Sequence, residues 1–311
     1  MSFTAEVKDE LSRVEGPRPC ETAQLAAMVR ACGTLSLSGQ QRFRLSLSTE
    51  TGAVARSIIR LFRSVYDLPC ELTVRRSVLH KARNYLLTVS SEHEGLAGAL
   101  VELGVLTARM SLESSIPQAL VAGDAEAAAY LRGAFMACGF IADPHAEAHF
   151  ELVSHTLPFA EGLAGLLARL GIGARVSRRR GSFVIYLKNA EDIIAFLEAA
   201  RAPAARAAVE GARAVKSARN DANRLVNADF ANQRKASEAA SSQTELIDAV
   251  DAEIGFDRLP PALRDFCELR RAHPELSLRE LGEAASPPLS KSAVYHRVRR
   301  LGELLAEARA K

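Results

Sequence analysis

Leu25-Ala-Ala-Met-Val-Arg-Ala-Cys-Gly-Thr-Leu35 and Leu131-Arg-Gly-Ala-Phe-Met-Ala-Cys-Gly-Phe-Ile141 are two copies of one pattern, 106 positions apart in a chain of 311 residues. Small residues recur four apart in both copies, Ala27 and Ala31 in the first and Gly133 and Ala137 in the second. This spacing lets two helices approach closely, and the glycine after each helix permits a turn into a strand. The pattern therefore predicts a duplicated unit whose two helices pack together.

The same order of elements follows each copy. Alternating apolar and polar residues predict strands, and a 3.6-residue period predicts helices. We expect strands at 42–48, 71–75 and 85–89 with a helix at 53–66 in the first unit, and strands at 147–153, 174–178 and 183–188 with a helix at 158–170 in the second. The predicted fold class is therefore α+β, a duplicated αββαββα domain at 21–200 with repeats at about 21–106 and 124–200, preceded by a helix within residues 1–20.

This order of elements and its leading helix resemble the LAGLIDADG homing endonuclease fold, in which two such units form a saddle of sheet over DNA. The resemblance implies that an acidic residue just before the final glycine of each motif binds a divalent metal for phosphodiester cleavage. Cysteines stand at both positions, Cys32 and Cys138, and the motif's other acidic position is Arg30 in one copy and Met136 in the other. Soft thiols do not hold magnesium, so we predict degenerate metal positions and no nuclease activity. A metal-dependent endonuclease is the alternative that these cysteines oppose.

The last stretch, residues 276–308, has the pattern of a helix-turn-helix. Ser277 is placed to cap the first helix, and Glu280 three residues later completes a capping box. The Pro287-Pro288 pair delays the start of the second helix, because proline lacks an amide and restricts the residue before it. Apolar residues on the second helix recur at four and three positions and would face the core: Val294, Val298 and Leu301.

Outside this apolar stripe the second helix is polar or cationic, which is typical of a helix that enters the major groove of DNA. Its N-terminal residues would face base edges, and arginines further along would hold phosphates. The predicted DNA-binding residues are the N-cap Ser290, the base-reading Lys291, Ser292, Tyr295 and His296, and the phosphate-binding Arg297, Arg299 and Arg300. Two alternatives are an amphipathic helix that only packs on its neighbour and a scaffold module that binds RNA polymerase rather than DNA.

Residues 201–244 are predicted as a helical linker to a helix-turn-helix domain at 245–311. Asparagines and arginines recur there at helical spacing: Arg219, Asn220, Asn223, Arg224 and Asn227. Asparagine is a poor helix former, so three on one face indicate hydrogen bonds to phosphates or between domains; an interdomain helix with a polar face is the equal alternative. The alanine- and serine-rich stretch 235–243 is predicted as a hinge before a helix at about 244–254.

The saddle offers additional cations for DNA, namely Arg42 and Arg44 on one strand and Arg178, Arg179 and Arg180 at a predicted hairpin tip. Two carboxylates, Glu147 and Glu151, are expected on one strand of the second unit and would repel phosphate. A protein-contact or structural role is therefore the favoured expectation for the saddle. His145, His149 and His155 would share a strand face with these carboxylates, but successive side chains there lie about 6.5 Å apart and do not converge on a zinc ion.

Composition is that of a soluble globular protein, with 48% hydrophobic and 25% charged residues and no apolar run near the ~20 residues that span a bilayer. The acidic first residues do not resemble a signal peptide. The net charge of the chain is +3, and the whole excess of cationic residues lies in residues 201–311. This distribution agrees with a protein that contacts a polyanion mainly through its C-terminal third. Five cysteines lack CxxC spacing: Cys20, Cys32, Cys70, Cys138 and Cys267. They indicate a reducing cytoplasm, and we expect neither a metal site nor a cofactor.

Four segments together are identified as signatures of the WhiA family: residues 2–11, 130–135, 219–227 and 289–297. They occur in order across essentially the whole chain. The resemblance implies a bacterial transcription regulator that binds double-stranded promoter DNA and is associated with sporulation, cell division and chromosome segregation. It also implies a nucleoid-associated cytoplasmic location, with RNA polymerase and a WhiB-like iron-sulfur co-regulator as partners.

Overall fold

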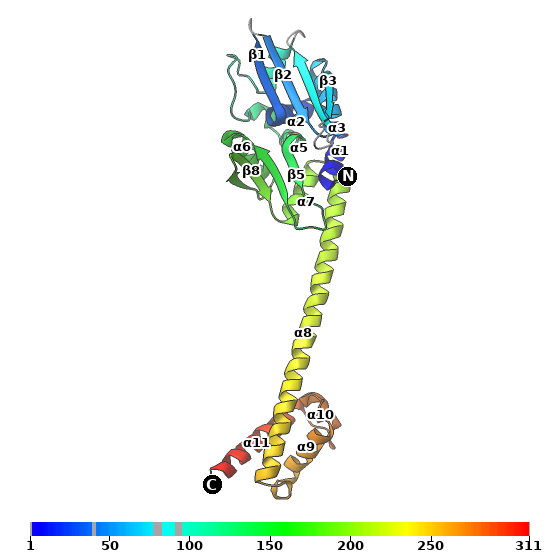
Figure 1. The fold of residues 1–311 in the computed structure, drawn as a ribbon, viewed down its shortest axis with the longest axis vertical. Coiled ribbons are helices and arrows are strands. Elements are labelled where there is room, and N and C mark those ends of the chain that lie inside the picture. Colours follow the sequence, from blue (N-terminus) through cyan, green and yellow to red (C-terminus); the bar gives the residue numbers. More distant parts are fainter. Residues whose placement is uncertain (1, 39–41, 77–82, 91–94, 311) are drawn as a thin grey trace. The chain divides into compact units, whose positions relative to one another are not determined.

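The computed structural model describes residues 2–38, 42–76, 83–90 and 95–310 (Figure 1). The chain divides into two compact units, Met1–Lys216 and Ser217–Lys311. The first, the duplicated unit, combines helices with two antiparallel sheets, and the second, the helical module, has helices alone among its described residues. The predicted α+β class with a helical C-terminal part is therefore confirmed.

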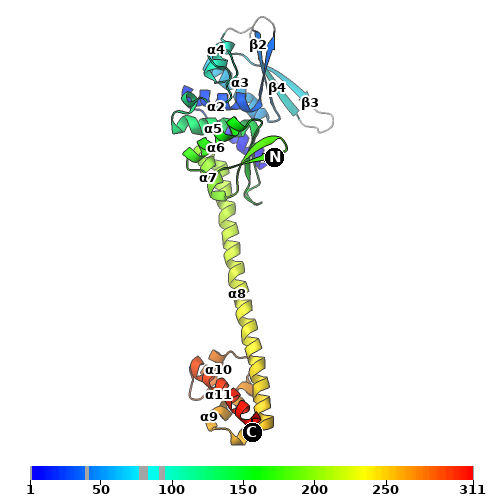
Figure 2. The same ribbon diagram turned by 90° about the vertical axis from the view of Figure 1, so that its left-hand side faces the viewer.

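Two helices, α2 (Arg18–Cys32) and α5 (Asp124–Cys138), form the centre of the duplicated unit and lie side by side (Figure 1 and Figure 2). Each ends at a cysteine, and the glycine that follows opens a strand. A Cβ added at Gly133 would lie 2.1 Å from the carbonyl oxygen of Gln24 and 3.1 Å from the Cβ of Ala27. Only glycine allows this backbone approach, so the predicted pairing of the two copies through their small residues is confirmed.

Each helix of this pair leads into a four-stranded antiparallel sheet of the same topology, β1-β2-β4-β3 in the first copy and β5-β6-β8-β7 in the second. The first sheet consists of β1 (Gly33–Ser38), β2 (Arg42–Thr49), β3 (Glu71–Arg76) and β4 (Arg83–Ser90). The second consists of β5 (Gly139–Ile141), β6 (Phe150–Ser154), β7 (Arg175–Arg179) and β8 (Ser182–Leu187). Helices α3 (Gly52–Tyr66) and α6 (Leu157–Arg169) pack on the first and second sheets, and α4 (Leu96–Glu102), the 3-10 turn η1 (Gln118–Val121) and α7 (Ala190–Ala199) complete the unit.

Strand alternation gives each sheet a buried face and an open face. In the first sheet Leu47 of β2 lies opposite Leu87 of β4, and both are fully buried. In the second sheet Leu152 of β6 and Ile185 of β8 are paired and buried in the same way. Burial of these aliphatic side chains holds each sheet against its helices, at about 25 cal/mol per Å² of apolar surface. The opposite face of each sheet is left for other contacts.

The second sheet corrects the strand predicted at 147–153. β6 begins at Phe150, because Asp143 turns the chain before it: its carboxylate accepts the amide two residues later at 2.9 Å. Aspartate favours such local bonds over strand pairing. Glu147 consequently lies outside the strand, and of the two predicted carboxylates only Glu151 stands on β6.

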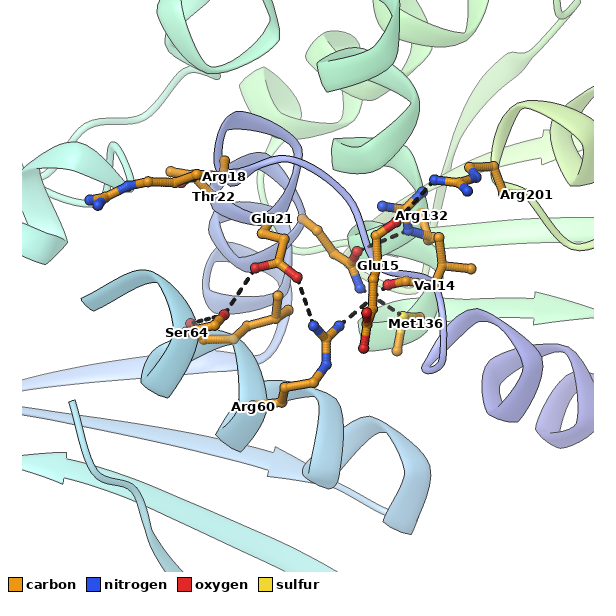
Figure 3. Close-up of polar contacts among 12 residues, drawn as sticks. Val14, Glu15, Arg18, Glu21, Thr22, Arg60, Ser64, Arg132, Met136 and Arg201 are labelled. Atoms are coloured by element: carbon orange, nitrogen blue, oxygen red, sulfur yellow. Dashed lines mark hydrogen bonds and ion pairs between the residues drawn. The ribbon is translucent and has the colours of Figure 1, made fainter. Parts of the chain in front are cut away.

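A polar network crosses the helix pair (Figure 3). Arg132 of α5 is buried, and its Nε donates to Oε1 of Gln24 in α2 at 2.9 Å, while the amide nitrogen of Gln24 lies 3.4 Å from Sδ of Met136. Loss of hydration, and next the charge of Arg201, lower the pKa of Arg132 to about 10. A buried charge that loses its hydrogen-bond partner is costly. Sliding α2 along α5 would break the bond between Arg132 and Gln24, so this bond fixes the register of the two helices.

The N-terminal helix α1 (Phe3–Leu11) joins this unit to the start of α8 (Pro203–Glu253). Thr4 donates its hydroxyl to the carbonyl of Ile141 at 2.7 Å. The carboxylate of Glu10 accepts the amides of Ala204 and Ala205 at 2.7 and 3.0 Å. A carboxylate there caps amides that α8 cannot satisfy internally.

The helix α8 is continuous over 51 residues, so the predicted hinge at 235–243 is wrong. Residues 212–254 contain neither glycine nor proline. Alanine is the best helix former, and serine costs at most about 0.7 kcal/mol per residue, so this composition does not interrupt a helix. Residues of α8 up to Lys216 belong to the duplicated unit, and the remainder belong to the helical module.

The helical module combines the end of α8 with η2 (Phe256–Arg258), α9 (Pro261–Ala272), α10 (Leu278–Ala284) and α11 (Lys291–Arg309). A single apolar core joins them, with Ile247, Val250, Leu263, Phe266, Cys267, Leu281, Val294, Leu301 and Leu305 buried together. No helix in the described part of either unit is long and apolar enough to cross a membrane.

Candidate nucleic-acid interface

The helices on either side of the turn are capped as the sequence predicts. Ser277 accepts the amide of Glu280 at 3.3 Å through its hydroxyl, and the Glu280 carboxylate accepts the amide of Ser277 at 2.8 Å. The capping box is therefore confirmed. At the second helix the hydroxyl of Ser290 accepts the amide of Ala293 at 3.2 Å, and α11 begins at Lys291. Both caps satisfy amides that the helices leave free and fix where each helix begins.

Gly282 holds the turn against α10. Its carbonyl accepts the amide of Leu289 at 2.8 Å, and a Cβ at Gly282 would lie 2.3 Å from the Leu289 carbonyl oxygen. No larger residue fits at this close backbone approach. This backbone contact with α10 fixes the position of residue 289 and therefore of the first turn of α11, which begins two residues later.

One face of α11 packs on the core and the other meets solvent. Val294 and Leu301 are buried, as predicted, and Val298 packs against the same core. On the opposite side four residues of the first two turns are exposed: Lys291, Ser292, Tyr295 and His296. We call these four the recognition face. They recur at i, i+1, i+4 and i+5, so they form one continuous stripe at the N-terminal end of the helix.

The cations further along α11 differ in their surroundings. Arg299 pairs with Glu303 at 3.3 Å, and Arg300 pairs with Glu303 at 3.0 Å and with Glu307 at 3.5 Å. Hydrogen bonding to Glu303 raises the pKa of Arg300, which stays charged. Arg297 is half-buried and forms no ion pair with any described carboxylate. Exposed pairs contribute about 0–1 kcal/mol, so a phosphate can replace Glu303 at these arginines.

Arg270, which the sequence analysis missed, anchors the approach to the turn. Its side chain is 1% exposed, and its Nε and Nη2 donate to Oε1 of Gln243 in α8 at 3.0 and 2.8 Å. Its Nη1 donates to the carbonyls of His273 and Leu276, which precede α10. The signal was present, because Arg270 occupies an apolar position of α9, three and four residues after Cys267 and Phe266.

The asparagine and arginine residues of α8 stand exposed within the helical module. Arg224 pairs with Asp221 one turn away. The side-chain amides of Asn220, Asn223 and Asn227 form no hydrogen bond with the described residues of this module, whereas their backbone groups take part in the helix. Their amide groups are therefore free to bind a ligand, and the choice between a phosphate contact and a polar helix face stays a prediction.

In the first sheet Arg44 is exposed on the open face, opposite Ser36 of β1 and Ser90 of β4. The side chain of Arg42 lies outside the described part of the structure. Serine hydroxyls and a free arginine on one open face are compatible with phosphate contact.

The predicted hairpin tip of the second sheet is confirmed by Arg180 and Gly181, whose φ angles are 51° and 86°. Arg178 and Arg179 are consecutive on β7, so they point to opposite faces of the sheet. Oε1 of Glu151 lies 2.8 Å from Nε2 of His149 and 3.6 Å from Nη1 of Arg179. The three arginines therefore do not form one cationic surface.

The degenerate metal positions, Cys32 and Cys138, are the last residues of α2 and α5. Burial raises the pKa of Cys32 to about 12 and that of Cys138 to about 11, so both thiols are protonated near neutral pH. The ammonium of Lys8, which the sequence analysis also missed, acts electrostatically on both thiols. No group of three or more histidine, cysteine or carboxylate side chains in the described ranges could hold a metal ion. The arrangement offers no hard oxygen ligand at either motif position.

Comparison with known proteins covers both units. Residues 18–103 match the WhiA N-terminal LAGLIDADG-like domain, residues 127–219 the WhiA LAGLIDADG-like domain, and residues 222–305 the WhiA C-terminal HTH domain.

Two curated relatives span the whole chain, and both are named as probable cell division protein WhiA. The protein from Heliobacterium modesticaldum is 40% identical over 99% of this chain and 97% of its own length. That from Alkaliphilus metalliredigens is 36% identical over 100% of this chain and 99% of its own length. A crystal structure of full-length DUF199/WhiA from Thermatoga maritima, 24% identical, covers 99% of both chains with a TM-score of 0.59 and agrees in fold. On the strength of these matches, the chain belongs to the WhiA family.

Proposed function

We propose that this protein is a sequence-specific regulator of transcription that binds promoter DNA through α11 and acts in cell division and chromosome segregation, and in sporulation where cells sporulate. The observation that carries the proposal is the recognition face: a lysine, a serine, a tyrosine and a histidine exposed together at the capped start of a helix whose other side is buried. Tyr295, 57% exposed, is a large aromatic with no core to fill, which favours a binding role.

The recognition face would enter the major groove with its N-terminal end toward the bases. Lys291 suits the O6 and N7 acceptors of guanine, whereas Ser292 and His296 can donate to or accept from either base of a pair. Arg297, Arg299 and Arg300 would bind phosphates and supply the salt-dependent part of the affinity. The free amides at the start of α11 add a further site for a phosphate oxygen.

One helix-turn-helix buries little DNA surface, so affinity needs further contacts. Arg219 and the exposed asparagines of α8 are candidates in the helical module, and Arg44 is the candidate in the first sheet. The affinity for DNA would also rise if the protein bound together with a second subunit, with RNA polymerase or with a WhiB-like co-regulator, because linked contacts reinforce one another.

The protein is proposed to lack nuclease activity. Two protonated thiols stand at the motif positions where cleavage needs hard oxygen ligands, and Arg30 and Met136 supply none. Incubation of the pure full chain with supercoiled plasmid and magnesium or manganese should leave the plasmid intact. Metal-dependent nicking would overturn this part of the proposal.

The DNA-binding proposal is tested by fluorescence anisotropy of the full chain with labelled promoter duplexes at several salt concentrations. Lys291→Ala should cost about 1–3 kcal/mol on the preferred duplex and less on an unrelated one. Arg297→Ala should weaken binding to both duplexes and reduce the salt slope by about one. Arg309→Ala, at the far end of the same helix, is the matched control. No binding even at low salt would favour a scaffold that contacts polymerase.

A further inference from the structure

The duplicated unit contains a cavity of about 100 Å³ between β5, the loop that precedes β6, α7 and the N-terminal part of α8. Its floor consists of buried apolar side chains from three elements: Ile141 of β5, Ile193 of α7, and Val209 and Ala212 of α8. Four further alanines line it, Ala142, Ala146, Ala148 and Ala190. The space is therefore left by small side chains at the point where these elements meet.

The size and the lining of this cavity decide what can fill it. A buried water molecule needs about 10–15 Å³ and two to four polar partners, and the side chains of the floor offer none. An apolar cavity of about 150 Å³ holds benzene, so a cavity of about 100 Å³ suits a smaller group than an aromatic ring. A branched aliphatic group meets both requirements.

The rim of the cavity carries ionisable side chains, most of which already have partners. Arg213 of α8 pairs with Glu191 of α7 at 2.5 Å. The carboxylate of Asp143 accepts a backbone amide of its own turn at 2.9 Å. His149 contacts Glu151 at 2.8 Å. These groups are satisfied within the unit and leave little capacity for a ligand.

Two charged side chains of the rim have no ion pair or side-chain hydrogen bond with any described residue: Glu147 of the loop and Lys216 of α8. Both are exposed, and although they border the same cavity, no ion pair joins them. Ligand sites typically combine an apolar lining with a few polar groups that fix orientation. One free carboxylate and one free ammonium beside an apolar floor complement a ligand that carries both opposite charges.

We propose that this cavity binds a small α-amino acid with a branched aliphatic side chain. The side chain fills the floor between Ile193 and Ala212, the ammonium group meets Glu147, and the carboxylate meets Lys216. A ligand with only one of these two charges leaves the other rim group unpaired. Because the ligand contacts the loop, α7 and α8 together, its binding stabilises the N-terminal part of α8 against local opening.

The first test titrates the full chain with L-leucine by calorimetry, and one molecule per chain should bind. Isocaproate has the same branched chain without the amino group, and isoamylamine has it without the carboxylate. Each should bind at least about 10-fold more weakly than leucine, because each loses a hydrogen bond between charged groups. Isocaproate binding as tightly as leucine would overturn the assignment of Glu147.

Two variants assign the charges one at a time. Glu147→Gln should weaken leucine binding about 10-fold and leave isocaproate binding unchanged, since isocaproate has no ammonium group to lose. Lys216→Met should weaken leucine binding by a similar factor and leave isoamylamine binding unchanged. Equal weakening of leucine and its analogue by either variant would contradict the proposed orientation.

A third variant fills the cavity. Ala212→Leu places a larger side chain in the floor and should abolish leucine binding. Ala214→Leu, at an exposed position of α8 that does not line the cavity, is the matched control and should bind leucine as the parent does. Thermal unfolding followed by circular dichroism shows whether each variant is folded.

Hydrogen exchange of the unmodified chain removes any dependence on variant folding. L-leucine should slow exchange in residues 142–149 and 209–216 and leave α11 unchanged, whereas isocaproate at the same concentration should have a smaller effect. Absence of leucine binding by the parent, unchanged leucine binding by folded Ala212→Leu, or equal exchange of residues 142–149 with and without leucine would overturn the proposal.

Discussion

The duplicated unit and the helical module use their cationic side chains in different ways. In the duplicated unit Arg132 is buried against Gln24, and Arg179 lies beside the carboxylate of Glu151. In the helical module Lys291 stands exposed at the start of a helix whose opposite face is fixed by the core. The comparison teaches that the placement of cations, more than their number, decides which part of a chain suits a polyanion.

The largest effect that separates the two units is expected at the helix pair. Gly133→Ala places a Cβ 2.1 Å from a backbone oxygen, so α2 and α5 must separate, at a cost of about 3 kcal/mol. Hydrogen exchange should show faster opening of α2 and α5 with α11 unchanged.

Gly165→Ala on α6 is the control for this substitution, because nothing lies within 4 Å of the added Cβ. It should be neutral or stabilise by up to about 1 kcal/mol, since alanine is the better helix former. Equal loss of protection in both variants would show that the helix pair is not the specific contact described here.

A smaller effect concerns the arginines beyond the recognition face. Glu303→Gln removes the carboxylate that holds Arg299 and Arg300, so DNA affinity at low salt should increase a few-fold, by about 0.2–1 kcal/mol. Glu245→Gln removes the same charge from an exposed position of α8 and is the control. If anisotropy titrations show the same increase in DNA affinity for both variants, the change in net charge alone explains it, and Arg299 and Arg300 have no special role.

The smallest effect is a pH dependence at the far end of α11. Arg309 donates to both carboxylate oxygens of Glu253 at 2.6–3.0 Å, and this hydrogen bonding lowers the pKa of Glu253 below its ordinary 4.5. Because the pKa of Glu253 is lower in the folded state than in the unfolded state, its pairing with Arg309 contributes its full share of stability above pH 4.5. That share is lost as the pH falls through the pKa of the folded state. Glu253→Gln should therefore lower the melting temperature slightly at pH 7, with the difference from the parent closing in acid. An unchanged difference at pH 3 would contradict this assignment.

Local patterns in the sequence predicted the features that depend on neighbouring residues. The capping box at Ser277, the cap at Ser290 and the small-residue contact of Gly133 each follow from a few adjacent positions, and each is present. The same reasoning failed at 235–243, where serine content was taken to indicate a hinge although nothing there breaks a helix. It also extended a strand through 147–149, where a turn at Asp143 intervenes.

Side chains whose role depends on distant parts of the chain were not predicted. Lys8 comes from the first helix, and its charge acts to lower the pKa of thiols 24 and 130 positions later, Cys32 and Cys138; no spacing rule links such positions. Arg270 bonds Gln243 across two helices. The recognition face was predictable because a single helix carries all four of its residues. The opposite directions of Arg178 and Arg179 were not predicted, because β7 continues to Arg179 whereas the predicted strand ended at 178.

Selection of bound duplexes from a random DNA library tests the central claim most directly, comparing the full chain with its Ser292→Ala, His296→Ala double variant. The account predicts that the parent enriches one preferred sequence, and that the double variant enriches a different or more degenerate one while still binding DNA at low salt. Enrichment of the same sequence with the same strength by both proteins would contradict the assignment of base reading to α11.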